Sequence, residues 1–281
     1  MYTQSSVKTH LTRQLGAVAF AVWAVCSGSA HAELVSLVDY STMSQIGSQQ
    51  FYKQASDTVA TASSGSAYLG SYKLSTGQWA FCLSPFTDAQ VGVSDYNKVT
   101  LGDFLAPGGA YEQQFALTNP NYAGFAPGYD NQAGAGNTAL AGSVINKIVS
   151  MFNWAYADSQ VATGNISAAE KSAAFAYALW EIEGESGAYD TAAGGLRQSG
   201  LNADVQAYAS TLFANLASGN WAGFSFQSYS FEVYQATPIT SSQSFLVVTP
   251  TGNTVPEPAT VLLVGASLLA LAGARRAAVR R

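Results

Sequence analysis

The chain has 281 residues, of which 48% are hydrophobic and only 10% are charged, and its formal net charge is −5. Between residues 33 and 255, six lysines and arginines stand against sixteen acids, so this stretch alone carries −10. Binding to phosphate backbones needs a basic surface, so we expect no nucleic-acid partner.

The amino-terminal end has the pattern of a secretory signal peptide. Two basic residues precede the apolar run Leu15–Val25, and the small-x-small sequence Ala30-His31-Ala32 follows it. Eleven apolar residues are too few for a spanning helix, which favours a removed signal over an anchor. The sequence therefore predicts a signal peptide over 1–32 and a mature chain that begins at Glu33.

Removal of the signal would also remove both histidines and one of the two cysteines. His10, His31 and Cys26 all lie within it, which leaves Cys82 as the one cysteine of residues 33–255 and no histidine. This excludes Ser-His-Asp and Cys-His nucleophile systems, HExxH zinc sites and His/Cys metal clusters. It also excludes an intramolecular disulfide, and we expect neither a metal nor a cofactor.

The first part of the domain is predicted to be a β-hairpin followed by a loop region. Alternating apolar residues over 67–74 and 78–83 flank Ser75-Thr76-Gly77, which predicts two strands joined by a glycine turn. Residues 100–137 hold much of the glycine, proline and asparagine, and predict an aromatic-rich loop.

The second part is predicted to be helical and then extended again. Apolar residues at helical spacing predict three helices, and period-two patterns after Trp221 predict further strands. The helices are expected over 140–155, 167–183 and 205–216, and the strands around 224–226, 229–233 and 244–248. The second helix opens with a capping box, Ser167 to Glu170, and the third ends near Gly219.

Strands, then helices, then strands indicate an α+β fold. We expect an antiparallel β-rich domain, sandwich or barrel-like, with a helical insertion, over residues 33–248. Residues 249–255 (TPTGNTV) are predicted to be a short linker.

The carboxyl-terminal end has three parts in a fixed order. Pro256-Glu257-Pro258 comes first, the uncharged run 259–274 follows, and Arg275 and Arg276 open a basic tail. As a helix, the 16-residue run would be roughly 24 Å long, short for a bilayer core of roughly 30 Å. It is predicted to be a single membrane helix, with the arginines on the cytoplasmic side.

This ending, residues 256–281, resembles the PEP-CTERM sorting signal of exported proteins in Gram-negative bacteria that make extracellular polysaccharide. The resemblance implies recognition by an exosortase-type membrane protease or transpeptidase, with cleavage near Pro256 to Pro258. It implies export through the inner membrane, a membrane-anchored precursor, and then a place at the cell surface or in the extracellular matrix. Exopolysaccharide is the partner expected there.

A second resemblance concerns the domain itself. Phe81-Cys82-Leu83 and the later segment Ala178-Leu179-Trp180-Glu181 are similar to two motifs of bacterial surface adhesins with a thioester domain. In that family the cysteine condenses with a glutamine, but this chain has Ala176 at the glutamine position. The resemblance implies a thioester-domain-like fold without the reactive bond, unless another glutamine such as Gln160 or Gln198 approaches. We favour Cys82 as a buried apolar residue of a strand.

Two further functions remain open beside a non-enzymatic surface or matrix protein. Glu181, Glu183 and Glu185 lie in EIEGES, and a pair of acids held roughly 5 to 9.5 Å apart can hydrolyse a polysaccharide. We expect these acids to be a solvated helix end, because residues two apart on a helix point in different directions. A covalent thioester-type adhesin is the other alternative, and requires a new partner for Cys82.

Overall fold

The computed structural model describes residues 32–39, 43–51, 58, 62–83, 87, 94–113, 138–184, 189–239 and 241–251. Nine strands in these ranges form one antiparallel sheet system. They are β1 (Ala32–Val35), β2 (Leu37–Asp39), β3 (Met43–Phe51), β4 (Ala62–Leu74), β5 (Trp79–Cys82), β6 (Ser94–Val99), β7 (Leu196–Gln198), β8 (Tyr229–Ala236) and β9 (Phe245–Pro250).

The sheet nearly closes into a seven-strand barrel. Its strand order runs β1-β6-β8-β9-β5-β4, and β2 pairs with β4 at the far side. Since β1 and β2 are separated by Ser36 alone, one short segment pairs with β6 at one end and with β4 at the other. β3 extends the sheet beyond β4, and β7 pairs with β3. The barrel-like alternative of the predicted β-rich domain is the one that forms.

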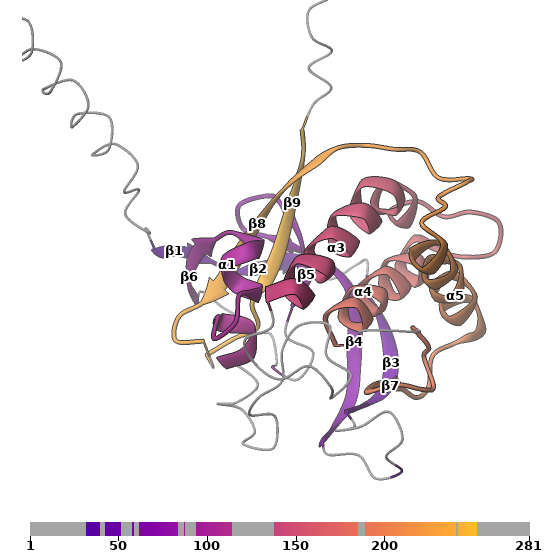
Figure 1. Cartoon of the computed structure of the whole chain (residues 1–281), viewed down its shortest axis with the longest axis horizontal. Helices are drawn as coiled ribbons and strands as arrows, with labels where there is room; N and C mark the ends of the chain where they lie inside the picture. The colour runs from indigo at the N-terminus through magenta and orange to yellow at the C-terminus, as the bar shows by residue number, and fades with distance from the viewer. Residues whose placement is uncertain are drawn as a thin grey trace, which may run out of the picture.

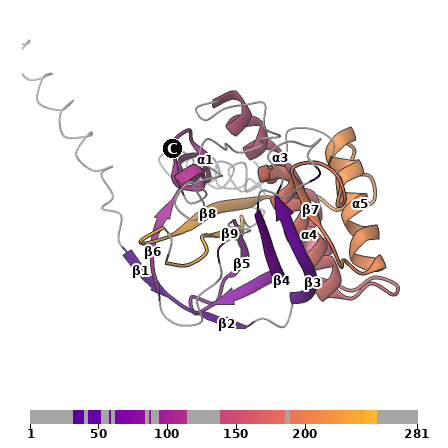
Figure 2. The ribbon, with the colours of Figure 1, turned by 90° about the horizontal axis from the view of Figure 1, so that it is seen from below.

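The helices lie between β6 and β8 in the sequence, as a helical insertion between neighbouring strands. They are α1 (Leu101–Leu105), α3 (Thr138–Ser159), α4 (Ala168–Gly184) and α5 (Ala203–Ser218). Figures 1 and 2 show α3, α4 and α5 grouped at one side of the barrel. There α4 packs against β3 and β4 on one side, and against α3 and α5 on the other. The predicted α+β fold with a helical insertion is confirmed at this level.

An aromatic cluster fixes the helices on the barrel. The Phe81 ring of β5 lies 5.5 Å from Phe152 of α3 and 5.2 Å from Phe175 of α4, measured between centroids. Phe152 and Phe175 are themselves 4.7 Å apart at an interplanar angle of 87°. Such edge-to-face pairs add roughly 0.5–1.5 kcal/mol each beyond the area that they bury. The cluster therefore holds β5, α3 and α4 together around one core.

The predicted hairpin and helix ends are confirmed. β4 and β5 are joined by a turn in which Gly77 has φ +84° and its N–H donates to the Leu74 carbonyl at 2.8 Å. At the start of α4, the Ser167 N–H donates to Glu170 Oε2 at 2.8 Å, and the Glu170 N–H donates to Ser167 Oγ at 3.2 Å. α5 ends at Gly219, which has φ +65°. These are the positions where local sequence determines the backbone.

The predicted loop over 100–137 is partly wrong, because it begins with a helix. Thr100 caps α1 by accepting the Asp103 N–H at 3.0 Å, and Leu101, Phe104 and Leu105 are buried. A further helical turn covers 110–113. Residues 114–137 lie outside the described part of the chain.

The strand predicted around Phe224 and Phe226 is also wrong. Gly223 has φ +93° and the Phe224 N–H donates to the Trp221 carbonyl at 3.1 Å, which makes a turn. The Gln227 N–H then donates to the Asn153 carbonyl of α3 at 2.7 Å rather than to a strand. Extended pairing starts only at β8, after this tie to α3.

Two of the predicted segment boundaries fall within described strands. β1 begins at Ala32, one residue before the predicted mature terminus, and β9 continues through Thr249 and Pro250 into the predicted linker. The predicted signal peptide before Ala32, residues 252–255 of the linker and the predicted membrane helix lie outside the described residues. Within the described ranges, no helix has the length and apolar character that a membrane span requires.

Candidate functional site

Segments 81–83 and 178–181, far apart in the sequence, meet at the junction of β5 and α4. Cys82, the last residue of β5, is 2% exposed, and Trp180 of α4 is 3% exposed. The Trp180 Nε1–H donates to the Cys82 carbonyl at 2.8 Å. This hydrogen bond joins residues 98 positions apart, so it fixes the strand and the helix in one relative position.

α4 places its side chains in a dry interior because it is buried on every side. All residues from Lys171 to Gly184 are buried, including Ala178 and Leu179. Lys171 keeps its charge paired at the start of the helix, where its Nζ lies 2.9 Å from Asp158 Oδ2. Alanines at 173, 174, 176 and 178 allow the close approach of β4 and of the neighbouring helices.

The structure brings neither alternative glutamine, Gln160 or Gln198, to Cys82. Ala176 is 1% exposed and offers only a methyl group. Gln198 lies on β7, three strands from β5 in the order β5-β4-β3-β7, which is about 14 Å across the sheet. Gln160 donates to Ser159 Oγ at 3.0 Å at the end of α3, near the start of α4 rather than near Trp180. Neither of the two alternative glutamines is within bonding distance of the Cys82 thiol.

The prediction of a solvated helix end at EIEGES is wrong for Glu181 and Glu183, because both are 0% exposed. The Tyr177 hydroxyl, one turn earlier on α4, donates to Glu181 Oε1. The sequence did not reveal this burial, because the elements that cover α4, namely α5, β3 and β4, come from elsewhere in the chain. Glu185 lies outside the described residues.

Glu183 has the least usual environment of the junction. Neither of its carboxyl oxygens has a hydrogen-bond partner among the residues that the structure describes. Burial raises the pKa of Glu183 well above its ordinary value of 4.5, which favours the neutral, protonated acid. Such a group is tolerated inside the protein because protonation removes the charge that would otherwise be costly to bury.

Tyr111 completes the junction and comes from the helical turn that the sequence did not predict. Burial raises the pKa of its phenol well above the ordinary value, and the charged forms of Glu183 and Cys82 raise it further. A carboxyl, a thiol and a phenol therefore share one buried region. The sequence signal for helical structure here is the cap at the start of α1. Phe104 of α1 packs against Tyr111, with ring centroids 6.0 Å apart, so the capped helix and the turn lie together.

This set of groups is poorly suited to nucleophilic catalysis. A reactive thiolate needs a neighbouring cation or a helix N-terminus. Cys82 instead adjoins the carboxyl-terminal half of α4, where the helix dipole is negative, together with Glu183 and Tyr111. Among the described residues, no group of three or more His, Cys, Asp and Glu side chains could hold a metal ion.

Comparison with known proteins identifies a functional element at the carboxyl-terminal end of the chain. Residues 254–277 match the PEP-CTERM protein-sorting motif. The match contains Pro256, Glu257, Pro258, Arg275 and Arg276, and it implies an exported protein that an exosortase sorts to the cell surface. No curated protein and no solved structure matches the chain.

The motif is limited to the carboxyl-terminal end, outside the described residues. It concerns delivery of the protein and carries no information on what the barrel domain does.

Proposed function

We propose that the chain is a non-enzymatic protein of the cell surface or extracellular matrix, associated with exopolysaccharide or biofilm. The observation that carries this proposal is the sorting motif at 254–277, which supports export of the barrel domain as cargo of an exosortase. The apolar run 259–274 and the arginines after it would hold the precursor in the membrane until the exosortase cuts near Pro256 to Pro258.

The interior of the domain supports a structural or binding role. Its buried carboxyls and the Cys82 thiol are packed around α4, and Trp180 hydrogen-bonds the strand directly. The acidic balance of residues 33–255 favours solubility outside the cell.

Polysaccharide hydrolysis is the main alternative, and the positions of the acids weigh against it. A glycosidase needs one acid and one base that flank a bound sugar. Glu181 and Glu183 are 0% exposed and cannot reach a polymer without unfolding of α4. The case for a thioester-type adhesin is weak for a different reason, because Ala176 cannot supply a carboxamide to Cys82.

The sorting half of the proposal can be tested by replacing Pro256, Glu257 and Pro258 with alanine in the native host. We expect the variant to accumulate as an uncut, membrane-held precursor, while a Thr251→Ala control outside the motif is processed like the parent. Equal processing of the alanine variant and the control would contradict exosortase recognition through this triplet.

The non-enzymatic half needs a separate assay on host exopolysaccharide. We expect no increase in reducing ends when the polymer is incubated with the parent protein. Polymer cleavage by the parent that disappears in folded Glu181→Gln or Glu183→Gln variants would replace this proposal with the hydrolase.

A further inference from the structure

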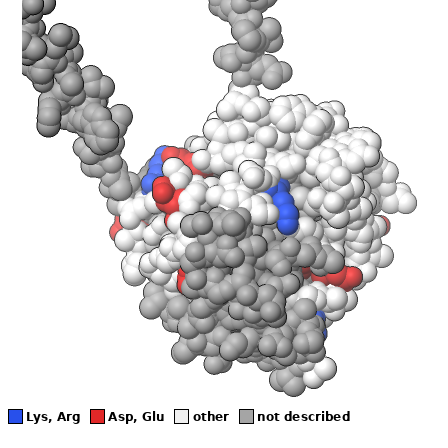
Figure 3. All heavy atoms as spheres, in the orientation of Figure 1, with Lys and Arg blue, Asp and Glu red and all other residues white. Residues whose placement is uncertain are grey.

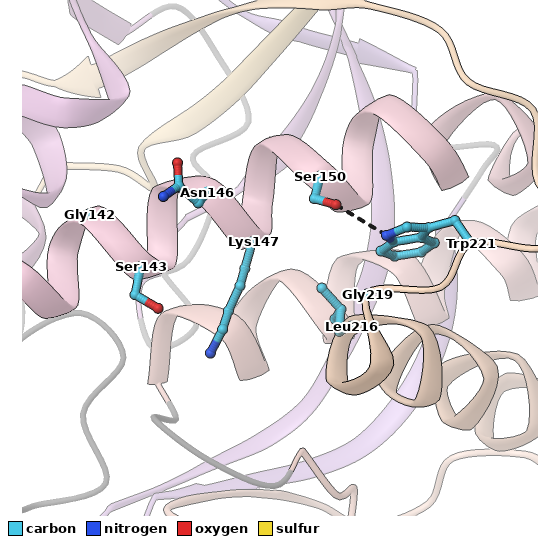
Figure 4. A pocket seen from close by; sticks show the side chains of 8 residues that line it. All are labelled: Gly142, Ser143, Asn146, Lys147, Ser150, Leu216, Gly219 and Trp221. Atoms are coloured by element: carbon cyan, nitrogen blue, oxygen red, sulfur yellow. Dashed lines mark hydrogen bonds between the residues drawn. The ribbon is translucent and has the colours of Figure 1, made fainter.

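An open groove lies between α3 and the end of α5, away from the β5–α4 junction. Its volume is about 550 Å³, within the range of small-molecule sites. Figure 4 shows the residues that line it. They are Gly142, Ser143, Asn146, Lys147 and Ser150 of α3, and Leu216, Gly219 and Trp221 at the end of α5 and after it.

One wall of the groove is polar because of the spacing along α3. Positions 143, 146, 147 and 150 are related by steps of three and four residues, which places them on one side of a helix. Ser143 and Asn146 are exposed, and they offer a hydroxyl and a carboxamide to solvent. Both groups can donate and accept hydrogen bonds, as recognition of a hydroxyl-rich ligand requires.

The opposite wall is apolar and fixed in place. Trp221 Nε1–H donates to Ser150 Oγ at 3.1 Å, which ties the segment after α5 to α3 (Figure 4). The Phe224 ring packs edge-on against Trp221 at 5.8 Å. Leu216 continues the wall from the last turns of α5, and Gly219, with φ +65°, turns the chain there. A ligand would meet a preformed surface and would not have to order it.

Lys147 gives the groove a positive charge. Its Nζ lies 5.1 Å from the centroid of the Tyr189 ring, and no described carboxylate lies within salt-bridge distance of it. Lys98 and Lys171, by contrast, pair with Glu232 at 3.4 Å and with Asp158 at 2.9 Å.

The surroundings of Lys147 make it a favourable place for an anion. Lys147 is half-buried, so its ammonium has lost part of its hydration, and this burial lowers its pKa. Among the described residues on the face drawn in Figure 3, charged side chains are few and scattered. An anionic group on a ligand would accept a charge-assisted hydrogen bond from the Lys147 ammonium, in place of the water that burial has removed.

We propose that this groove binds an acidic saccharide, a short glycan segment with a hexuronate carboxylate. The carboxylate would pair with Lys147, and sugar hydroxyls would bind Ser143 and Asn146. The apolar C–H face of a ring would lie against Leu216 and the small part of Trp221, 6% of its surface, that is exposed. A small inorganic anion would use Lys147 alone and leave the apolar wall without a role. The inference rests on the proposed function for its compartment and gives it a substrate class.

The test is calorimetric titration of the full-length protein in detergent with trigalacturonate, its methyl ester and acetate. We expect trigalacturonate to bind at least tenfold more tightly than the other two. Lys147→Met should weaken trigalacturonate binding at least tenfold, and Lys147→Arg should retain it. Asn146→Ala should weaken it severalfold. Lys73→Met is the matched control, because Lys73 also lies over an aromatic ring, that of Trp79 at 5.9 Å, but outside the groove.

Several results would overturn the inference. One is an absence of trigalacturonate binding at millimolar concentration. Another is equal affinity for trigalacturonate and its methyl ester, or for trigalacturonate and acetate. A third is unchanged binding by a Lys147→Met protein with the parent's melting temperature. Since this assay does not depend on processing, its failure would leave the sorting test unaffected, and failed sorting would leave the binding result intact.

Discussion

Replacement of Trp180 by alanine should strongly destabilise the domain. The side chain is 3% exposed, and a buried indole removes roughly 200 Å² from water, worth about 5 kcal/mol at about 25 cal/mol per Å². Measured losses for buried aromatic residues are about 3–5 kcal/mol, and the hydrogen bond to the Cys82 carbonyl contributes about 1 kcal/mol of this. Trp180→Phe, which keeps a buried ring but loses that bond, should cost about 1–2 kcal/mol.

Urea unfolding, followed by far-ultraviolet circular dichroism, measures both variants against the parent. Val161→Ala is the control, because Val161 is 54% exposed in the connection after α3 and its loss should stay within about 0.5 kcal/mol. A Trp180→Ala protein within about 1 kcal/mol of the parent would refute the argument that Trp180 holds α4 to β5.

Three further predictions follow from the region around α4. Burial raises the pKa of Glu183 in the folded protein above the unfolded value, so the folded state binds more protons, and stability should fall as pH rises above about 4.5. Glu183→Gln should therefore increase the free energy of unfolding at pH 7 and flatten its pH dependence, and a decrease at pH 7 would contradict this. Ser167→Ala should lower the free energy of unfolding by about 1 kcal/mol through loss of the capping box, and no change in urea unfolding would count against it. Cys82 should show no mass deficit of one ammonia and should titrate as one thiol after denaturation, whereas a deficit that disappears on methylamine treatment would reveal a thioester.

Local signals in the sequence were sufficient wherever the backbone is determined by neighbouring residues. The Gly77 turn, the Ser167–Glu170 capping box and the Gly219 helix end each depend on contacts within a few positions. The apolar face of α3 was equally clear, since Val144 and Ile148 are at most 2% exposed. The meeting of Cys82 and Trp180 could not be read from local pattern, because 98 positions separate them.

Other parts depend on contacts that one segment of sequence does not contain. β3 has few large apolar residues, and it is a strand because it pairs with β4 and β7. β6, with the sequence SDYNKV, is held between β1 and β8. The burial of Glu181 and Glu183 has the same origin, since their cover comes from other elements. The groove beside Lys147 also could not be predicted, because it forms where α3 meets the end of α5.

The intact mass of the protein recovered from its native host tests the central claim most directly. We expect exosortase-competent cells to contain a species that begins at Glu33 and ends near Pro256 to Pro258, and cells without the exosortase to retain the carboxyl-terminal segment. Recovery from competent cells of only species that retain the intact segment from Val261 to Arg281 would contradict it.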